Sequence, residues 1–193
     1  METRDAILAA ARRQFDRGGI EGLSLRDVAG EVGITAMAVY RHYANKQALI
    51  DALVLDALDE WSAIVAAIPA GKPIETMLRI GDAHLDFALK RPRRYEAAFL
   101  VRSEHARRYP DDFVAGRSPG GAALTALIER AMNDGTLVRS APIEILLPLA
   151  ALAQGLITLY FAGRVAGGES KFRTIYRRAM RRFVDSHRAE PRA

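Results

Sequence analysis

Apolar residues recur at helical spacing along most of the chain. Near the N-terminus they follow four-residue steps or the spacing i, i+3, i+4, i+7: Ile7, Ala11 and Phe15, then Leu25, Val28, Ala29 and Val32. This spacing places apolar side chains on one face of a helix. There is no sustained apolar/polar alternation, and no Asn-Gly or Asp-Gly turn joins two β-branched runs. The pattern therefore predicts an all-α fold.

Capping residues and helix breakers divide this pattern into separate helices. Ser24, Thr35 and Asn45 stand at positions that favour helix N-caps, and Asp27 resembles the acidic half of a capping box. Gly33 separates the second helix from a third that contains Val39 and Tyr43. The predicted helices cover about residues 4–17, 25–32, 36–43, 45–68, 74–90, 93–105, 122–133, 142–164 and 170–187.

Turn-forming residues mark the predicted loops. They are PAGKP at residues 69–73, the run from Tyr109 to Asp112, GRSPGG at 116–121 and the glycine pair at 167–168. Pro148 falls inside the predicted helix 142–164, so it should either kink that helix or mark its true start.

The chain contains no cysteine. A disulfide framework, a thiolate metal site and a cysteine nucleophile are therefore excluded, and a reducing compartment is favoured. The N-terminal run METRDAILAAARRQF mixes charges with apolar residues and lacks the continuous apolar stretch of a secretory signal peptide. We expect a cytoplasmic protein.

The net charge of +5 suits a polyanionic partner but does not locate its binding site. Residues 1–50 hold seven Lys or Arg against six Asp or Glu. Most of the surplus lies in Lys90 to Arg108 and in Lys171 to Arg192. The isoelectric point alone is therefore poor evidence for a nucleic-acid surface.

Residues 145–163 form an uncharged stretch of 19 residues, close to the length that spans a bilayer. The stretch includes Pro148, Gln154, Gly155 and Thr158, and alanine supplies much of its apolar content. A helix at a subunit interface fits this mixture better than lipid contact does. We expect a homodimer and no membrane partner.

Residues 23–50 carry the strongest functional signal. Two short helices around a glycine turn, the second with only Val39 and Tyr43 as strong inward positions, describe a helix-turn-helix with one open face. The Tyr40 hydroxyl, the His42 imidazole and the Lys46 ammonium are donors within seven residues. Such donors beside a helix N-terminus suit a DNA phosphate.

This segment resembles the DNA-binding head of the tetracycline-repressor (TetR) family, with matching stretches at GIEGL (19–23) and ALIDAL (48–53). The residues that carry the resemblance are Tyr40, His42, Tyr43, Asn45, Lys46 and Leu49. The resemblance implies a three-helix head in residues 1–47 and a helical effector-binding and dimerisation body in 48–193. It also implies a regulator, expected to be a repressor, that binds an inverted-repeat operator in double-stranded DNA as a dimer.

By the same resemblance, ten residues are expected at the DNA: Ser24, Arg26, Thr35, Ala36, Met37, Ala38, Tyr40, Arg41, His42 and Lys46. Several of these positions also suit a role without DNA. Ser24 and Thr35 serve as N-caps whether or not DNA is bound, and Arg41 suits a solvated surface. Tyr43 is expected in the core. Met37 replaces the small or turn-forming residue frequent at its place in the family.

The resemblance implies that the last two long helices form a four-helix bundle with a second copy, and that the body binds a small, mostly apolar effector that lowers operator affinity. His84 shares a helical face with Met77, Ile80, Gly81 and Ala88, which suits either a pocket or a core histidine. The other pocket candidates are Tyr95, Phe99, Gln154 and Tyr160.

Two other classes of function are weaker. The four histidines show no HExxH spacing, and GxSxG, phosphate-loop and dinucleotide motifs are missing from the sequence, which argues against an enzyme. A helical protein-interaction module would not need the donors Tyr40, His42 and Lys46. No cofactor is expected.

Overall fold

The computed structural model describes residues 2–189, and its regular elements in this range are ten helices and one isolated bridge between Leu137 and Arg188. The all-α prediction is confirmed. The chain forms two compact units. The first comprises Met1–Trp61 and Lys90–Ala106, and the second comprises Ser62–Leu89 and Arg107–Ala193.

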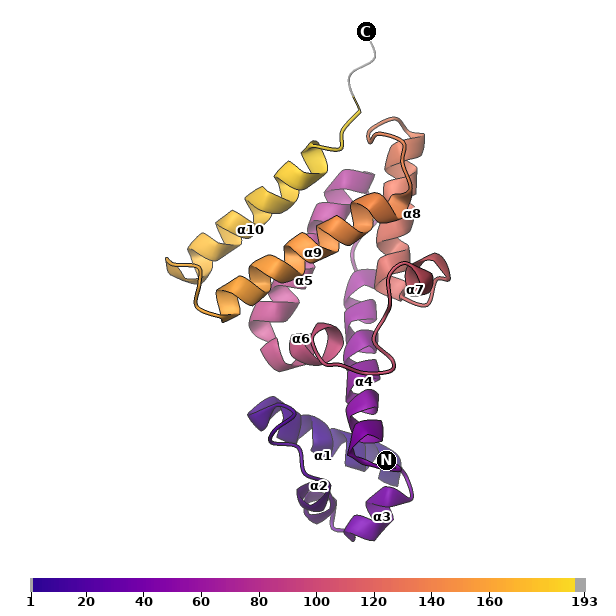
Figure 1. Ribbon diagram of the computed structural model, residues 1–193, viewed down its shortest axis with the longest axis vertical. Coiled ribbons are helices and arrows are strands. Elements are labelled where there is room, and N and C mark those ends of the chain that lie inside the picture. Colours follow the sequence, from indigo (N-terminus) through magenta and orange to yellow (C-terminus); the bar gives the residue numbers. More distant parts are fainter. Residues whose placement is uncertain (1, 190–193) are drawn as a thin grey trace. The chain divides into compact units, whose positions relative to one another are not determined.

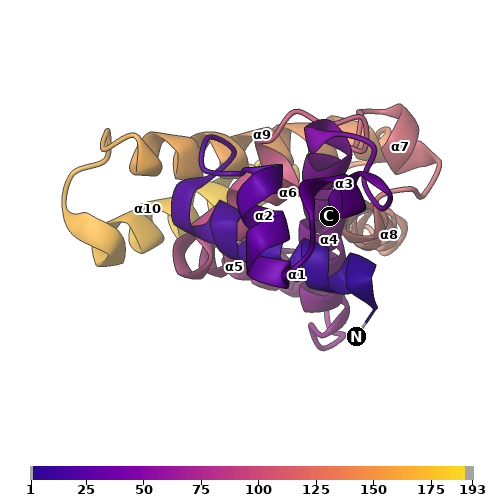
Figure 2. The same cartoon turned by 90° about the horizontal axis from the view of Figure 1, so that it is seen from below.

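The first unit contains the N-terminal helices (Figures 1 and 2). In chain order they are α1 (Thr3–Gly18), α2 (Leu25–Val32), α3 (Ala36–Tyr40), most of α4 (Lys46–Ala66) and, from the second stretch, α6 (Pro92–Phe99). Helix α2 packs against both α1 and α3. The core that joins them includes Ile7, Phe15, Val28, Val39, Tyr43 and Leu49.

The predicted N-caps of this unit are confirmed. The Asp27 amide donates to the Ser24 hydroxyl at 3.3 Å, and the Ala38 amide donates to the Thr35 hydroxyl at 3.2 Å. Asn45 accepts from the Ala48 amide at 2.8 Å. These bonds satisfy amides that have no partner in the first turn of a helix.

The second half of the predicted capping box comes from another helix. The backbone amide of Ser24 donates to the side chain of Gln14 in α1, at 3.2 Å. Gln14 is buried. The start of α2 is therefore fixed by a tertiary bond to α1, in the role expected of Asp27.

The third helix is shorter than predicted because α3 ends at Tyr40. The two residues that follow form a turn, yet the Tyr43 amide still donates to the Val39 carbonyl at 3.0 Å. Tyr43 is buried, with its hydroxyl 3.5 Å from the Arg4 carbonyl. The prediction that Tyr43 belongs to the core is confirmed.

The second unit contains the remaining helices and the last turn of α4 (Figure 1). They are α5 (Pro73–Lys90), α7 (Asp111–Val114), α8 (Pro119–Asn133), α9 (Pro142–Phe161) and α10 (Gly168–Asp185). Helix α9 packs against α8 and α10. The core of the second unit includes Leu85, Ile128, Leu146, Ile157, Phe172 and Tyr176.

The predictions were least accurate between residues 99 and 121. Helix α6 ends at Phe99, not near His105, and residues 111–114 form α7 inside a segment predicted as loop. Helix α8 begins within GRSPGG, because Ser118 caps it and Pro119 occupies its first position, where no amide hydrogen is needed. At Gly121 a Cβ atom would lie 2.3 Å from the Phe113 ring, so the close packing there requires glycine.

Two smaller differences concern helix ends. Helix α4 ends at Ala66 rather than Ile68, and α10 includes Gly168, which was predicted to be loop. Pro148 lies inside α9, which runs without interruption from Pro142. The alternative that Pro148 marks the start of this helix was therefore wrong.

Helix α9 is long and apolar enough to cross a membrane by length and composition alone. Only 28% of its most apolar window is buried within this chain. Leu147, Leu159 and Phe161 are each more than 40% exposed. A large apolar face of α9 is thus left uncovered by the rest of the chain.

Candidate DNA-binding surface and effector-binding residues

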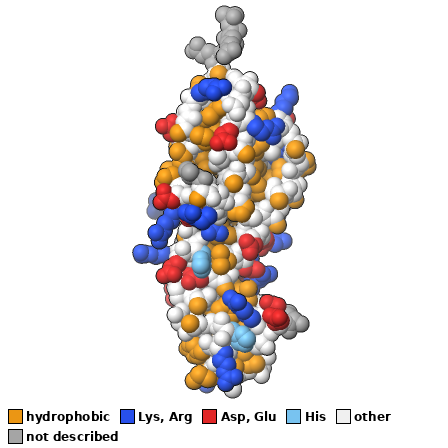
Figure 3. All heavy atoms as spheres, turned by 90° about the vertical axis from the view of Figure 1, so that its right-hand side faces the viewer, with side chains coloured by type: hydrophobic (Ala, Val, Ile, Leu, Met, Phe, Trp, Pro, Cys, Tyr) orange, Lys and Arg blue, Asp and Glu red, His pale blue; other side chains and the backbone are white. Residues whose placement is uncertain are grey.

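The predicted DNA-contacting residues are mostly accessible. Ser24 and Ala38 are half-buried, and the other eight side chains are exposed: Arg26, Thr35, Ala36, Met37, Tyr40, Arg41, His42 and Lys46. They belong to α2, α3 and the start of α4, which lie in the lower part of Figure 1. In Figure 3 the corresponding end of the molecule presents Lys or Arg and His side chains beside hydrophobic ones.

Helix α3 turns one side inward and the other outward. Val39 is fully buried and anchors the helix in the core. Met37 is 71% exposed and Tyr40 is 48% exposed, and their spacing of three residues puts them on one face. Ala36 is also exposed. The outward face of α3 is therefore largely apolar, with a hydroxyl at its C-terminal end.

Lys46 already has one protein partner. Its Nζ atom donates to the carbonyl of Ile20, in the loop between α1 and α2, at 3.2 Å. An ammonium group has three N–H donors, so two remain for another acceptor. The Ala48 amide donates to the Asn45 side chain. In the first turn of α4, the amides of Lys46 and Gln47 therefore have no hydrogen-bond acceptor among the described residues.

Basic residues on α1 are paired with acidic side chains. Arg13 is hydrogen-bonded to Glu31, and Arg17 approaches the same carboxylate at 3.7 Å. The hydrogen bond from Arg13 holds the pKa of Glu31 below its usual value. In residues 2–189, by contrast, Arg26 and Arg41 form no ion pair. Their positive charge is not neutralised by a paired carboxylate in this part of the chain.

A second ion-pair network links three helices of the first unit. Arg94 of α6 is 6% exposed and donates to Asp56 at 2.6 Å and to Glu60 at 2.8 Å, both on α4. Asp56 is also paired with Arg12 of α1, and Glu60 with Arg91. Burial opposes ionisation of Glu60, but the hydrogen bonds and charges of the two arginines outweigh it and lower its pKa.

The five predicted effector residues fall into the two units. Tyr95 and Phe99 lie in the first unit, with ring centroids 5.1 Å apart. His84, Gln154 and Tyr160 lie in the second. Burial in the second unit lowers the pKa of His84 to about 4, so its imidazole is neutral near pH 7. Its Nδ1 atom is 3.5 Å from the Tyr176 hydroxyl.

Aromatic neighbours of these candidates were missed by the sequence analysis. Phe99 meets Trp61 edge to face at a centroid distance of 5.8 Å. Tyr160 stacks on Phe172 at 4.2 Å, and Phe172 contacts Tyr176 at 6.2 Å. The i, i+4 spacing of Phe172 and Tyr176 was a usable signal, because it places both rings on one face of α10.

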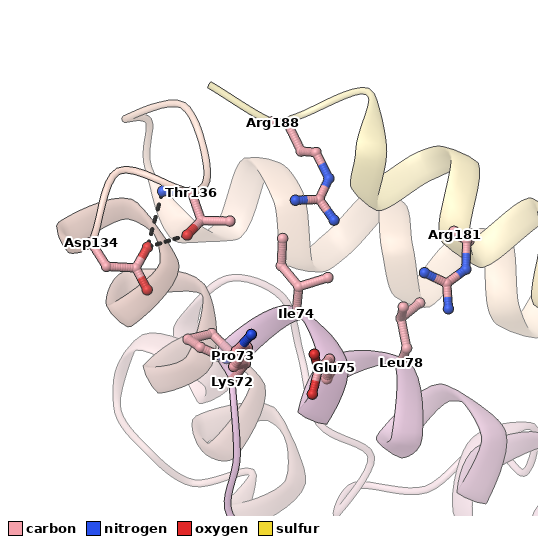
Figure 4. Close-up of a pocket in the computed structure, with 9 residues that line it drawn as sticks. All are labelled: Lys72, Pro73, Ile74, Glu75, Leu78, Asp134, Thr136, Arg181 and Arg188. Atoms are coloured by element: carbon pink, nitrogen blue, oxygen red, sulfur yellow. Dashed lines mark hydrogen bonds between the residues drawn. The ribbon is translucent and has the colours of Figure 1, made fainter. Parts of the chain in front are cut away.

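The second unit also has a surface pocket of about 620 Å³ that contains none of the five candidates. It lies where the start of α5, the turn after α8 and the end of α10 meet (Figure 4). Its lining residues are Lys72, Pro73, Ile74, Glu75, Leu78, Asp134, Thr136, Arg181 and Arg188. Within residues 2–189, no cluster of three or more His, Asp or Glu side chains could hold a metal ion.

Comparison with protein families identifies both parts of the chain. Residues 7–53 match the model "Bacterial regulatory proteins, tetR family", and residues 77–183 match "Tetracyclin repressor-like, C-terminal domain". The second match alone covers more than half of the chain. The chain belongs to the tetR family. The two TetR matches correspond to the helix-turn-helix segment and to most of the helical body.

Individual relatives agree with this assignment. The chain is 44% identical over 59 residues to the HTH-type transcriptional regulator TtgR of Pseudomonas putida, across 31% of this chain and 28% of TtgR. The match thus spans less than a third of the length of that relative.

Solved structures share the fold over nearly the whole chain. A protein of unknown function from Rhodococcus sp. RHA1 is 22% identical, with a TM-score of 0.77 over 98% of this chain and 96% of that one. A putative tetR family transcription regulator from Shewanella sp. PV-4 is 16% identical, with a TM-score of 0.67 over 98% of this chain and all of that one. At these identities the likeness concerns the fold alone.

Proposed function

We propose that this TetR-family chain is a cytoplasmic, dimeric transcriptional repressor that leaves an inverted-repeat operator when a small, mostly apolar effector binds its body. The observation that carries the proposal is the exposed face of α3, with Met37 at 71% exposure, together with the exposed cations Arg26 on α2 and Arg41 directly after α3. One exposed apolar side chain is ordinary on a protein surface. Its combination with exposed guanidinium groups in a segment that matches the tetR family model is what supports DNA binding.

Base reading is assigned to α2 and the start of α3. Arg26 offers a guanidinium fork that matches the O6 and N7 atoms of guanine. Ala36, Met37 and Ala38 lack strong donors or acceptors, so they would read thymine methyl groups by apolar contact. Each half-site should combine a G·C pair with an adjoining A·T-rich step.

Phosphate contacts are assigned to the residues around the α3–α4 junction. Tyr40 and His42 are exposed there, and Lys46 keeps two N–H donors after its bond to Ile20. Phosphate contacts fix the register of a protein on the duplex but carry no base identity. They should therefore set the affinity for every sequence alike.

Dimerisation is assigned to the exposed apolar face of α9. Leu147, Leu159 and Phe161 are exposed there, and the small residues Ala151 and Gly155 lie between them along the helix. Small residues allow two helices to approach closely, so a second copy of α9 suits this face. A two-fold dimer would place two heads on two half-sites about one helical turn apart.

Effector control would follow from differential binding. A ligand shifts the dimer toward the head spacing that it binds better, by no more than its difference in affinity for the two spacings. We propose α4 as the connection, because it begins in the first unit and its last turn belongs to the second. The aromatic groups around Phe99 and Tyr160 are the proposed sites for an apolar effector.

Selection of binding sites from random duplexes tests this proposal. We expect enriched inverted repeats with a guanine in each half-site, and a loss of about 1 kcal/mol or more per contacted step when uracil replaces thymine. Arg26→Ala should relax the guanine preference, whereas Arg17→Ala on α1 is the matched control. Failure to enrich any inverted repeat would contradict the repressor function; equal binding of uracil would contradict only methyl reading.

A further inference from the structure

We propose that the pocket at the start of α5 binds a small monocarboxylate with a short apolar tail, at a site separate from the proposed effector residues. The pocket lies wholly within the second unit. Its volume of about 620 Å³ falls inside the range of pockets that hold small organic ligands.

Two arginines supply the anion-binding groups. Arg181 and Arg188 extend from the α10 side toward the start of α5 (Figure 4). The Arg181 side chain forms no hydrogen bond or ion pair with another residue of the described part of the chain. Arg188 uses its Nε atom for Asp185, at 2.7 Å, and keeps both terminal nitrogens. Planar guanidinium forks match the two oxygens of a carboxylate.

The start of α5 adds to the positive potential. The helix has 18 residues and begins at Pro73, and the Lys72 carbonyl accepts the Thr76 amide at 3.0 Å. The amides of Ile74 and Glu75 precede the first bonded turn, so the positive end of the helix dipole faces the pocket. Lys72, which directly precedes α5, supplies a third cation to the lining of the pocket.

Two carboxylates in the lining limit the charge of the ligand. Asp134 accepts bonds from the Thr136 amide at 2.9 Å and the Thr136 hydroxyl at 2.5 Å, and these bonds lower its pKa. Glu75 stands in the first turn of α5, where a negative charge is favourable. The lining holds three cations and two anions, and Asp185 is ion-paired with Arg188, so the small surplus of positive charge favours a singly charged ligand over a polyphosphate.

The rest of the lining accounts for the tail. Pro73, Ile74 and Leu78 are the apolar members, and Ile74 is almost completely buried while the other two are half-buried. They provide an apolar wall close to the arginines. A carboxylate at Arg181 and Arg188 would let a short hydrocarbon chain lie against Pro73 and Leu78.

Calorimetric titration of the full chain with hexanoate tests the proposal. We expect saturable binding with one hexanoate per chain, and at least about tenfold weaker binding by the double variant Arg181→Gln/Arg188→Gln, since two charge-assisted bonds are lost. Arg178→Gln/Arg182→Gln makes the same change of charge on α10 at residues that do not line the pocket, and this variant should bind as the unmodified protein does.

Two further probes separate the components of the site. Hexanol keeps the tail without the charge and should bind at least about tenfold more weakly than hexanoate. Inorganic phosphate keeps the charge without the tail and should also bind more weakly. The absence of hexanoate binding, equal binding by the Arg181/Arg188 variant, or equal binding of either other probe would overturn the proposal. None of these results depends on DNA, so the proposed repressor function would stand.

Discussion

Lys46 has a role within the fold that is separate from its proposed role at the DNA. Its bond to the Ile20 carbonyl ties the α1–α2 loop to the start of α4. The ammonium group is therefore held in place in the free protein, which would lower the entropy lost in the phosphate contact that we propose for its remaining donors. The role at the DNA and the role in the loop must be separated by experiment.

Replacing Lys46 by Ala should weaken binding to all DNA sequences by a similar factor. One lost phosphate contact per half-site should also reduce the slope of log affinity against log salt by about one unit for each contact. Equilibrium binding at several salt concentrations measures this slope, and Lys171→Ala, an exposed lysine on α10, is the control. A slope that does not change would show that Lys46 does not contact the backbone.

His84 should make stability depend on pH. Its pKa is about 4 in the folded protein against 6.5 as the ordinary value. The unfolded chain therefore binds the proton more readily between these values, and stability is lost as pH falls from about 6.5 towards 4. The loss should approach ~1.4 kcal/mol per pH unit inside that window.

Denaturant unfolding from pH 8 to pH 5 measures this effect. His84→Gln removes the titrating group and keeps a side chain that can bond to Tyr176, so its stability should fall less than that of the unmodified protein. His105→Gln, at an exposed position, should follow the unmodified curve. Parallel curves for the unmodified protein and His84→Gln would contradict the assignment.

At the scale of helices, the interior of each element was predictable and several ends were not. The stripes of Ile7, Phe15 and Val28 and the caps at Ser24 and Thr35 are local signals, and the structure contains both. The end of α6 and the existence of α7 depend on neighbours. Asp112, for example, accepts hydrogen bonds from the Arg108 amide and the Arg117 guanidinium. These bonds stabilise a turn in a segment whose sequence predicts a loop.

In the candidate sites, too, features that depend on local sequence were predictable and those that depend on distant neighbours were not. The candidate DNA-contacting residues all come from one continuous segment, and all except Ser24 and Ala38 are exposed. The partners of His84 and Tyr160 come from a helix about 90 residues away or from the following helix. Likewise, Gln14 at the start of α2 and Arg94 beside α4 depend on tertiary contacts that periodicity does not encode.

Arg94 and Arg91 allow a direct comparison of a buried and an exposed ion pair with the same carboxylate. Arg94→Ala should destabilise the protein by about 3 kcal/mol, because it leaves Asp56 and Glu60 partly buried with only outer partners. Arg91→Ala should cost about 1 kcal/mol or less, because the Arg91 side chain is 60% exposed. Denaturant unfolding at neutral pH gives both values. Equal losses would mean that burial of Arg94 adds nothing.

At the scale of the whole molecule, the uncovered face of α9 predicts self-association. Leu159→Glu should convert the dimer to a monomer at micromolar concentrations, raising the dimer Kd by about a hundredfold or more. Two-fold symmetry places the substitution in the interface twice. Sedimentation equilibrium measures the effect. Val138→Glu, at a similarly exposed apolar residue off α9, should leave the dimer intact; a Leu159→Glu dimer would contradict the assigned interface.

The first compact unit is built from two separate stretches of chain, and this restricts how such proteins can exchange parts. A chimera that joins residues 1–47 to a foreign body would leave behind Asp56 and Glu60 on α4 and Arg94 on α6. Arg12 would then lose its carboxylate partner. Functional recombination of the head would require residues 90–106 to travel with residues 1–61, as a graft with three crossovers.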